Sequence, residues 1–72
     1  MAQKRETIIP KAPVARLVQK AGAKRVSSSA VDFLVEILEE RALDIGRQAV
    51  KIAKHSGRKT VNDGDVKLAV RV

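Results

Sequence analysis

The chain has 72 residues, and its 15 Lys and Arg against 8 Asp and Glu give a net charge of +7, so a two-domain organisation is excluded. It contains no Cys and only one His, which excludes a disulfide scaffold and disfavours a zinc site, and we expect no metal and no cofactor. No apolar run approaches the roughly 20 residues of a membrane span, and charges stand where a signal peptide would be apolar. We therefore expect a soluble, cytoplasmic protein that needs a partner subunit for stability.

A first short helix is predicted from the i, i+3, i+4, i+7 spacing of four apolar residues, Val14, Leu17, Val18 and Ala21. Either Pro10 or Pro13 lies near its first turn, where proline is tolerated. Gly22 is predicted to end the helix as a left-handed cap.

A long central helix is predicted at about residues 28 to 55. Its apolar stripe has helical spacing: Val31, Leu34, Val35, Leu38, Ala42, Ile45, Ala49, Ile52 and Ala53. One of the three serines at 27 to 29 caps its start, and Gly57 follows its end. Such a helix is about 42 Å long, whereas a compact chain of this size is only about 29 Å across. Because Phe33, Ile37, Leu43 and Val50 lie off the stripe, the chain cannot cover this helix by itself.

A third short helix is predicted after Asn62, which can cap it with Asp65 three residues on. Its inner face consists of Val66, Ala69 and Val70. The order short, long, short, with too little cover for the long helix, implies that two copies cross their long helices and share one core. Folding and dimerisation are then one event.

The charges change sign twice along the chain. Residues 1 to 27 carry a net charge of +6, residues 28 to 46 carry −4, and residues 47 to 72 carry +5. This pattern indicates one positive surface built from distant segments, which suits a polyanion. The acidic residues Glu36, Glu39, Glu40 and Asp44 are predicted to form a solvated face elsewhere.

Two short basic segments join the predicted helices, at residues 21 to 27 and 56 to 62. Together with the helix pattern, they resemble the archaeal histones over about residues 8 to 72. The most specific part is the run His55-Ser-Gly-Arg-Lys-Thr-Val followed by Asp65, because the family pattern has an Arg and a Thr in the second loop and an Asp in the third helix. The resemblance implies an all-α histone fold of short helix, long central helix and short helix, in a handshake homodimer. A paralogous histone as the second subunit is left open.

The resemblance also implies a function. It indicates a chromosome-associated histone, not an enzyme, that binds double-stranded DNA without sequence specificity. Homodimers of such a protein wrap and compact DNA and assemble into nucleosome-like particles or filaments.

The resemblance assigns DNA contacts to particular residues. In a histone-type dimer, the first loop of one subunit lies beside the second loop of the other, which gathers a phosphate clamp of Lys24, Arg25, Lys59 and Thr60. The amino ends of the first helices, near Lys11, form a third contact, and Arg16 points into the minor groove. For each cation the alternative is a solvated surface charge, and Thr60 can instead only cap its loop.

The remaining assignments concern assembly. Arg58 pairs with Asp65 and ties the second loop to the third helix, so it is not counted as a DNA contact. Dimers meet through Ile52, His55, Asp65 and Leu68, although His55 can instead be a cation favoured by the helix C-terminus. In filaments, Gly22 also lets successive DNA turns stack, and the acidic face can meet cations of a neighbouring turn.

Residues 1 to 7 extend beyond the usual start of the family and are predicted to be a flexible basic arm, followed by the histone-fold domain at residues 8 to 72. The arm adds a phosphate contact through Lys4 and Arg5.

Three other functions compete with this interpretation. An enzyme is disfavoured because the chain has no Gly-rich phosphate loop and no nucleophile beside a base. An RNA-binding protein would stack bases on aromatic rings, but Phe33 is the only Phe, Tyr or Trp and is expected in a core. A histone-fold transcription subunit with a different partner usually carries appended domains or lacks basic loops.

Overall fold

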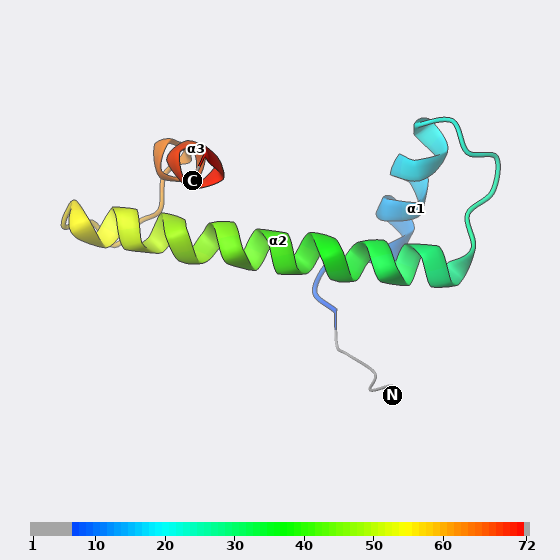
Figure 1. Ribbon diagram of the computed structural model, residues 1–72, viewed down its shortest axis with the longest axis horizontal. Helices are drawn as coiled ribbons and strands as arrows, with labels where there is room; N and C mark the ends of the chain where they lie inside the picture. Colours follow the sequence, from blue (N-terminus) through cyan, green and yellow to red (C-terminus); the bar gives the residue numbers. More distant parts are fainter. Residues whose placement is uncertain (1–6, 72) are drawn as a thin grey trace. The chain divides into compact units, whose positions relative to one another are not determined.

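The computed structural model describes residues 7 to 71 and contains three helices in chain order: α1 (Lys11–Lys20), α2 (Ser28–His55) and α3 (Asp63–Arg71) (Figure 1). No strand occurs among residues 7 to 71, so the predicted all-α class of short, long and short helix is confirmed. The predicted range of the long helix is also the observed one. Residues 1 to 6, with Lys4 and Arg5 of the predicted arm, lie outside the described residues. Within the described part, none of the three helices combines the length and the apolar character that crossing a membrane requires.

The chain divides into two compact units, Met1–Glu39 and Glu40–Val72, with the boundary inside α2. In the first unit, α1 packs on the first turns of α2 (Figure 1). The buried core of this unit consists of three valines, and four partly buried residues pack against it: Val14, Val31 and Val35, with Ile9, Ala15, Val26 and Leu34. This is a small core, because a fully buried valine stabilises a fold by only about 1.5 kcal/mol or somewhat more.

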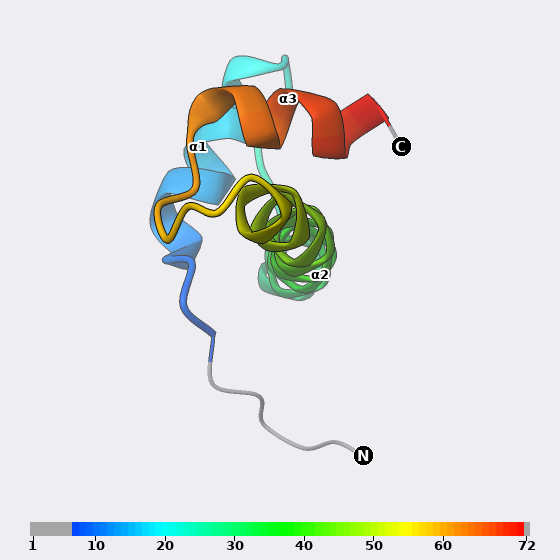
Figure 2. The same ribbon diagram turned by 90° about the vertical axis from the view of Figure 1, so that its left-hand side faces the viewer.

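In the second unit, α3 crosses the last part of α2 (Figure 2). The buried apolar side chains of this unit are Ala49, Ala53 and Ala69, and Asp65 is buried as well, with 3% exposure. A methyl group removes little apolar area from water, so three alanines contribute little hydrophobic stabilisation. The second unit therefore depends strongly on its polar contacts.

Glycines end α1 and α2 in the same way. Gly22 has a φ of 123° and Gly57 a φ of 72°, both in the region that favours glycine. After α2, the Gly57 N–H donates to the Lys54 carbonyl at 2.9 Å, and the Arg58 N–H donates to the Ala53 carbonyl at 2.9 Å. This pair of bonds is a Schellman motif, and the same pattern follows α1. The predicted left-handed cap at Gly22 is confirmed.

Side chains cap the amino ends of α2 and α3. Of the three candidate serines, Ser27 is the cap, because its hydroxyl accepts the Ala30 N–H at 3.1 Å. At α3, Asp65 Oδ2 accepts the Asn62 N–H at 2.8 Å. This bond is the half of a capping box in which the N3 carboxylate reaches back to the N-cap backbone, so Asn62 holds the predicted N-cap position immediately before α3.

Many large apolar side chains are exposed in the single chain. Phe33 is 64% exposed and Leu43 is 56% exposed, both on α2. Exposure of both side chains in the single chain agrees with the prediction that the chain cannot cover this helix by itself, and burial of Phe33 in a core shared with a second copy stays a prediction. Other large apolar residues that are more than a third exposed are Ile8, Leu17, Ile37, Leu38, Val50, Val61, Val66, Leu68 and Val70. Soluble monomers rarely leave large apolar patches uncovered, which favours a partner for this chain.

Candidate nucleic-acid interface

The cations that the sequence assigns to a phosphate clamp lie in the two loops. Lys24 and Arg25 are exposed in the first loop, residues 21 to 27, and Lys59 and Thr60 are exposed in the second loop, residues 56 to 62. Neither loop lysine nor Arg25 forms an ion pair with another described residue. Their charges are therefore available to an external anion. The predicted meeting of the two loops involves two different chains and stays a prediction.

A hollow of about 190 Å³ lies beside the second loop. Its lining combines apolar side chains with cations: Val50, Ala53, Lys54, Arg58, Lys59 and Val61. A mixed lining of this kind suits a peptide segment that is itself partly apolar, and the first loop of a second chain is predicted at this place.

Arg58 and Asp65 form a two-pronged ion pair. Arg58 Nη1 donates to Asp65 Oδ2 and Nη2 donates to Oδ1, both at 2.8 Å. Arg58 Nη1 also donates to the Thr60 carbonyl at 3.1 Å. Together with the bond from Asn62 to the same carboxylate, these contacts tie the second loop to the start of α3. Arg58 is thus engaged inside the chain, in contrast to its exposed neighbour Lys59.

The ion pair changes the acidity of both groups. The hydrogen bond from Arg58, together with the Asn62 N–H, lowers the pKa of the Asp65 carboxyl from 3.8 to about 2. The same hydrogen bond raises the pKa of Arg58 above its ordinary value. Asp65 therefore stays ionised at all but strongly acidic pH, which keeps the second loop attached to α3.

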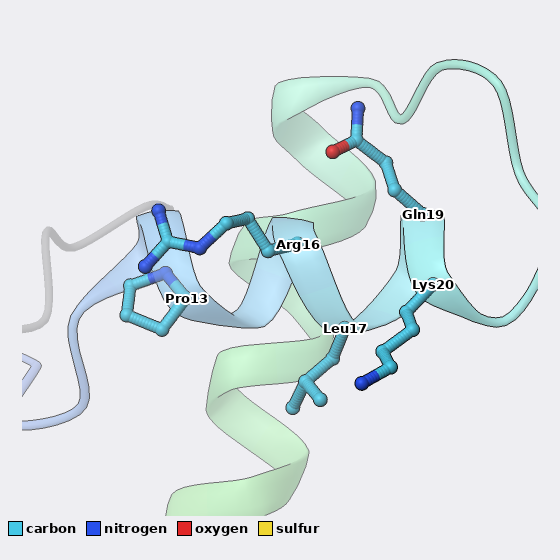
Figure 3. Close-up of a pocket in the computed structure, with 5 residues that line it drawn as sticks. All are labelled: Pro13, Arg16, Leu17, Gln19 and Lys20. Atoms are coloured by element: carbon cyan, nitrogen blue, oxygen red, sulfur yellow. The ribbon is translucent and has the colours of Figure 1, made fainter.

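Arg16 lies on an open surface of α1. Its side chain extends back toward the amino end of the helix, over Pro13 (Figure 3). The shallow hollow at this place is lined by residues of one helix only, Pro13, Arg16, Leu17, Gln19 and Lys20. Arg16 is exposed, so its guanidinium can reach an external groove, and the predicted minor-groove contact stays a prediction.

Lys11, the first residue of α1, has a partner within the chain. Its ammonium lies 2.7 Å from Asp32 Oδ1 on α2, and both side chains are about half exposed. An exposed pair of this kind is weak and easily exchanged. Lys11 can therefore turn to a phosphate, but only by leaving Asp32.

Glu39 departs from the predicted solvated acidic face. It is half-buried, and its Oε2 accepts the backbone N–H groups of Ile8 and Ile9, the latter at 2.7 Å. The prediction of a solvated face is wrong for this residue, and the role of Asp32 was not predicted at all. The available signal was their spacing of seven residues, which places both on one side of a helix. Among the described residues, no group of three or more acidic or His side chains is arranged to hold a metal ion.

The residues predicted to join dimers all lie in the second unit. His55 ends α2 and is exposed, Leu68 is 55% exposed, and Ile52 is half-buried. Asp65 is different, because both of its oxygens are bonded inside the chain. A contact between dimers at these residues stays a prediction. A Cβ atom at Gly22 would meet no atom within 4 Å, so the positive φ alone accounts for this glycine within the chain.

Known proteins are similar in sequence to this chain over most of its length. The chain is 52% identical over 63 residues to one of the chains of archaeal histone HAN1 from Thermococcus zilligii, and equally to probable archaeal histone 3 of Methanocaldococcus jannaschii; each alignment covers 88% of this chain and 94% of the relative. It is 35% identical over 63 residues to histone H4 of Tetrahymena thermophila, covering 88% of this chain and 61% of that protein. Residues 7 to 70 match the model of the family described as histone-like transcription factor (CBF/NF-Y) and archaeal histone. The chain therefore belongs to this family, and its short, long and short helices are those of the histone fold.

Proposed function

We propose that this chain is a histone that binds double-stranded DNA without sequence specificity and compacts it as a homodimer. Membership of the histone family supports a structural, non-enzymatic DNA-binding protein associated with the chromosome. The observation that carries the proposal is that the loop cations differ in their partners within the chain. Arg58 is used inside the chain, whereas Lys24, Arg25 and Lys59 point their charges at solvent without an ion-pair partner among the described residues.

Exposed apolar surface supports the dimer. The described part of the chain buries only six apolar residues, three of them alanines, and leaves large side chains of all three helices open to water. A second copy of the chain would cover these side chains and bring the first loop of one subunit to the second loop of the other. A paralogous histone is the alternative second subunit.

Phosphate contacts explain why sequence specificity should be weak. Exposed loop lysines and arginines reach the DNA backbone, which is the same in every sequence. Discrimination would then come from the energy of bending the duplex and from the width of the minor groove that Arg16 enters. Single-stranded RNA is a poorer ligand, because Phe33 is the only Phe, Tyr or Trp of the chain and the second subunit would cover it, which leaves no aromatic ring for stacking bases.

Loss of one clamp cation should weaken DNA binding equally on different sequences. We expect Arg25→Ala and Lys59→Ala each to reduce the slope of log K against log salt by about 2, because a dimer loses two phosphate contacts. The measurement is a fluorescence titration of two unrelated duplexes of equal length at several salt concentrations. Lys67→Ala is the matched control, since it removes one exposed charge of α3 that is loosely paired with Asp63 at 3.8 Å. A loss confined to one duplex, or an equal loss in the control, would refute the clamp.

Nuclease digestion on long DNA tests wrapping and assembly. We expect the protein to leave DNA fragments of defined length, because DNA that bends around a protein core is cut only between contacts. A single protected length indicates a closed particle, and a ladder with steps of one dimer indicates a filament. Digestion that leaves no defined length would show that the protein binds DNA without wrapping it.

A further inference from the structure

Helix α1 begins without a cap of its own. Its N-cap residue is Pro10, whose side chain makes no capping hydrogen bond, and no acidic residue lies in its first turn. The N–H groups of Lys11 and Ala12 can bind an anion at this helix end, whereas Pro13 has no N–H, and no capping side chain fixes the direction in which the two groups point. The direction must come from contacts with another element.

Glu39 of α2 supplies one such contact. One oxygen of its carboxylate accepts the N–H groups of Ile8 and Ile9, the two residues that lead into Pro10. Hydrogen bonds to an ionised acceptor are roughly twice as strong as those between neutral groups. The side chain of Ile9 also packs against the core of Val14, Val31 and Val35. The segment before α1 is therefore held by its backbone and by its side chain.

Asp32 supplies a second contact, two helical turns earlier on the same side of α2. Its carboxylate holds Lys11, the first residue of α1. The two acids thus hold the chain immediately before the helix and at its first residue. The Lys11 pair joins two half-exposed, movable side chains, whereas Glu39 is half-buried and both of its donors are backbone N–H groups.

We propose that Glu39 is a positioning residue for DNA binding: it fixes the amino end of α1 so that its first N–H groups and Lys11 meet a phosphate. The inference rests on the proposed function, because it assumes that this helix end contacts DNA. Glu39 touches no DNA itself. Its carboxylate is negative and would repel a phosphate if it were exposed, but its charge is directed at two N–H groups of its own chain.

The charge of Glu39 makes the test sharp, because removing any acid should strengthen DNA binding through Coulomb attraction alone. Glu40→Ala is the matched control, since Glu40 is the next residue of α2, is exposed, and loses the same charge. We expect Glu40→Ala to bind duplex DNA slightly more tightly than the unaltered protein. Glu39→Ala should instead bind about tenfold more weakly, with a salt slope smaller by about 2, because the dimer loses two α1 contacts. Glu39→Gln should restore most of the affinity, since an amide oxygen accepts the same two N–H groups.

The hydrogen bonds from the Ile8 and Ile9 N–H groups to Glu39 can be tested separately from DNA binding, by hydrogen exchange of these two amides in the DNA-free protein. Exchange should be slow in the unaltered protein and in Glu40→Ala, and fast in Glu39→Ala, at a temperature well below the melting of every variant. If Glu39→Ala matches Glu40→Ala in affinity and salt slope although exchange is fast, the positioning role is refuted. Slow exchange in Glu39→Ala would show that Glu39 does not hold the Ile8 and Ile9 N–H groups. If Glu39→Ala does not fold, Glu39→Asp replaces it, because its carboxylate keeps the charge but is one methylene group too short to hold the Ile8 and Ile9 N–H groups as Glu39 does. An affinity and salt slope equal to those of the unaltered protein, although exchange in Glu39→Asp is fast, would then refute the positioning role. A failure of the unaltered protein to bind duplex DNA would instead overturn the proposed function.

Discussion

Asp65→Ala should lower the melting temperature by more than about 10 °C, because it breaks a buried ion pair and leaves its partners without acceptors. Asp65 is 3% exposed and accepts three hydrogen bonds of 2.8 Å, two from Arg58 and one from the Asn62 N–H. Without it, the Arg58 guanidinium remains partly buried beside no acid, and the second loop is no longer tied to α3. Because the core of the second unit consists of alanines, little else holds α3 in place. Thermal unfolding followed by circular dichroism measures the effect.

The matched control is Asp63→Ala, two residues earlier on α3. Asp63 is exposed and lies 3.8 Å from Lys67, a distance at which a surface pair contributes little. We expect its melting temperature to stay within about 3 °C of the unaltered protein. The melting temperature of Arg58→Lys should lie between those of Asp65→Ala and Asp63→Ala, because lysine keeps the charge but cannot form both bonds to the Asp65 carboxylate. Equal melting of Asp65→Ala and Asp63→Ala would contradict the structural role of the pair.

The same pair should also show in the pH dependence of stability. The pKa of Asp65 is lowered in the folded chain to about 2, from 3.8, so its ionised form stabilises the fold. This contribution is fully present above about pH 4 and is lost as the pH falls toward 2. In Asp65→Asn the contribution is absent at every pH. The difference in melting temperature between the unaltered protein and Asp65→Asn should therefore shrink as the pH falls from about 4 toward about 2. A constant difference would contradict the stabilisation of the fold by ionised Asp65.

Ile37→Glu should raise the dissociation constant of the dimer at least about 10-fold, because Ile37 is only partly exposed in the single chain and each dimer loses two contributions of about 0.7 to 1.4 kcal/mol. Ile37 is 46% exposed on α2, near the middle of a helix that spans residues 28 to 55, and the exposed Phe33 lies one turn before it. Two long helices that cross near their middles would bury this side chain. A glutamate there would also carry its charge into the interface. Sedimentation velocity over a dilution series, with circular dichroism on the same samples, measures both association and folding.

The control for this substitution is Glu40→Ala, which alters an exposed polar residue three positions further along α2 and should leave the dimer intact. Because the cores of the two units are small, we expect helix content to fall together with association in Ile37→Glu. A variant that dimerises as tightly as the unaltered protein would show that Ile37 faces water in the dimer. A fully folded monomer of the unaltered chain at high dilution would be a more serious result, since it would remove the need for a partner.

The sequence by itself determined the features that depend on near neighbours. Helical spacing of apolar residues was enough to predict the range of α2, because a buried stripe repeats every three or four residues whatever it packs against. Gly22 as a left-handed cap and Asn62 with Asp65 at the start of α3 were predictable for the same reason, since their hydrogen bonds join residues only a few positions apart. The pairing of Arg58 with Asp65 followed from the family pattern and spans only seven residues.

The tertiary structure decided the features that join distant residues. Glu39 was indistinguishable from its acidic neighbours until the packing of α1 brought the Ile8 and Ile9 N–H groups, about thirty positions away, to its carboxylate. The same packing placed Asp32 beside Lys11, whereas Phe33 stayed exposed in the single chain, as the predicted lack of cover for the long helix required. The physical reason is that helical periodicity fixes which side chains share one face of a helix. The angle and offset between two packed helices then fix which of these side chains contact a residue of the other helix.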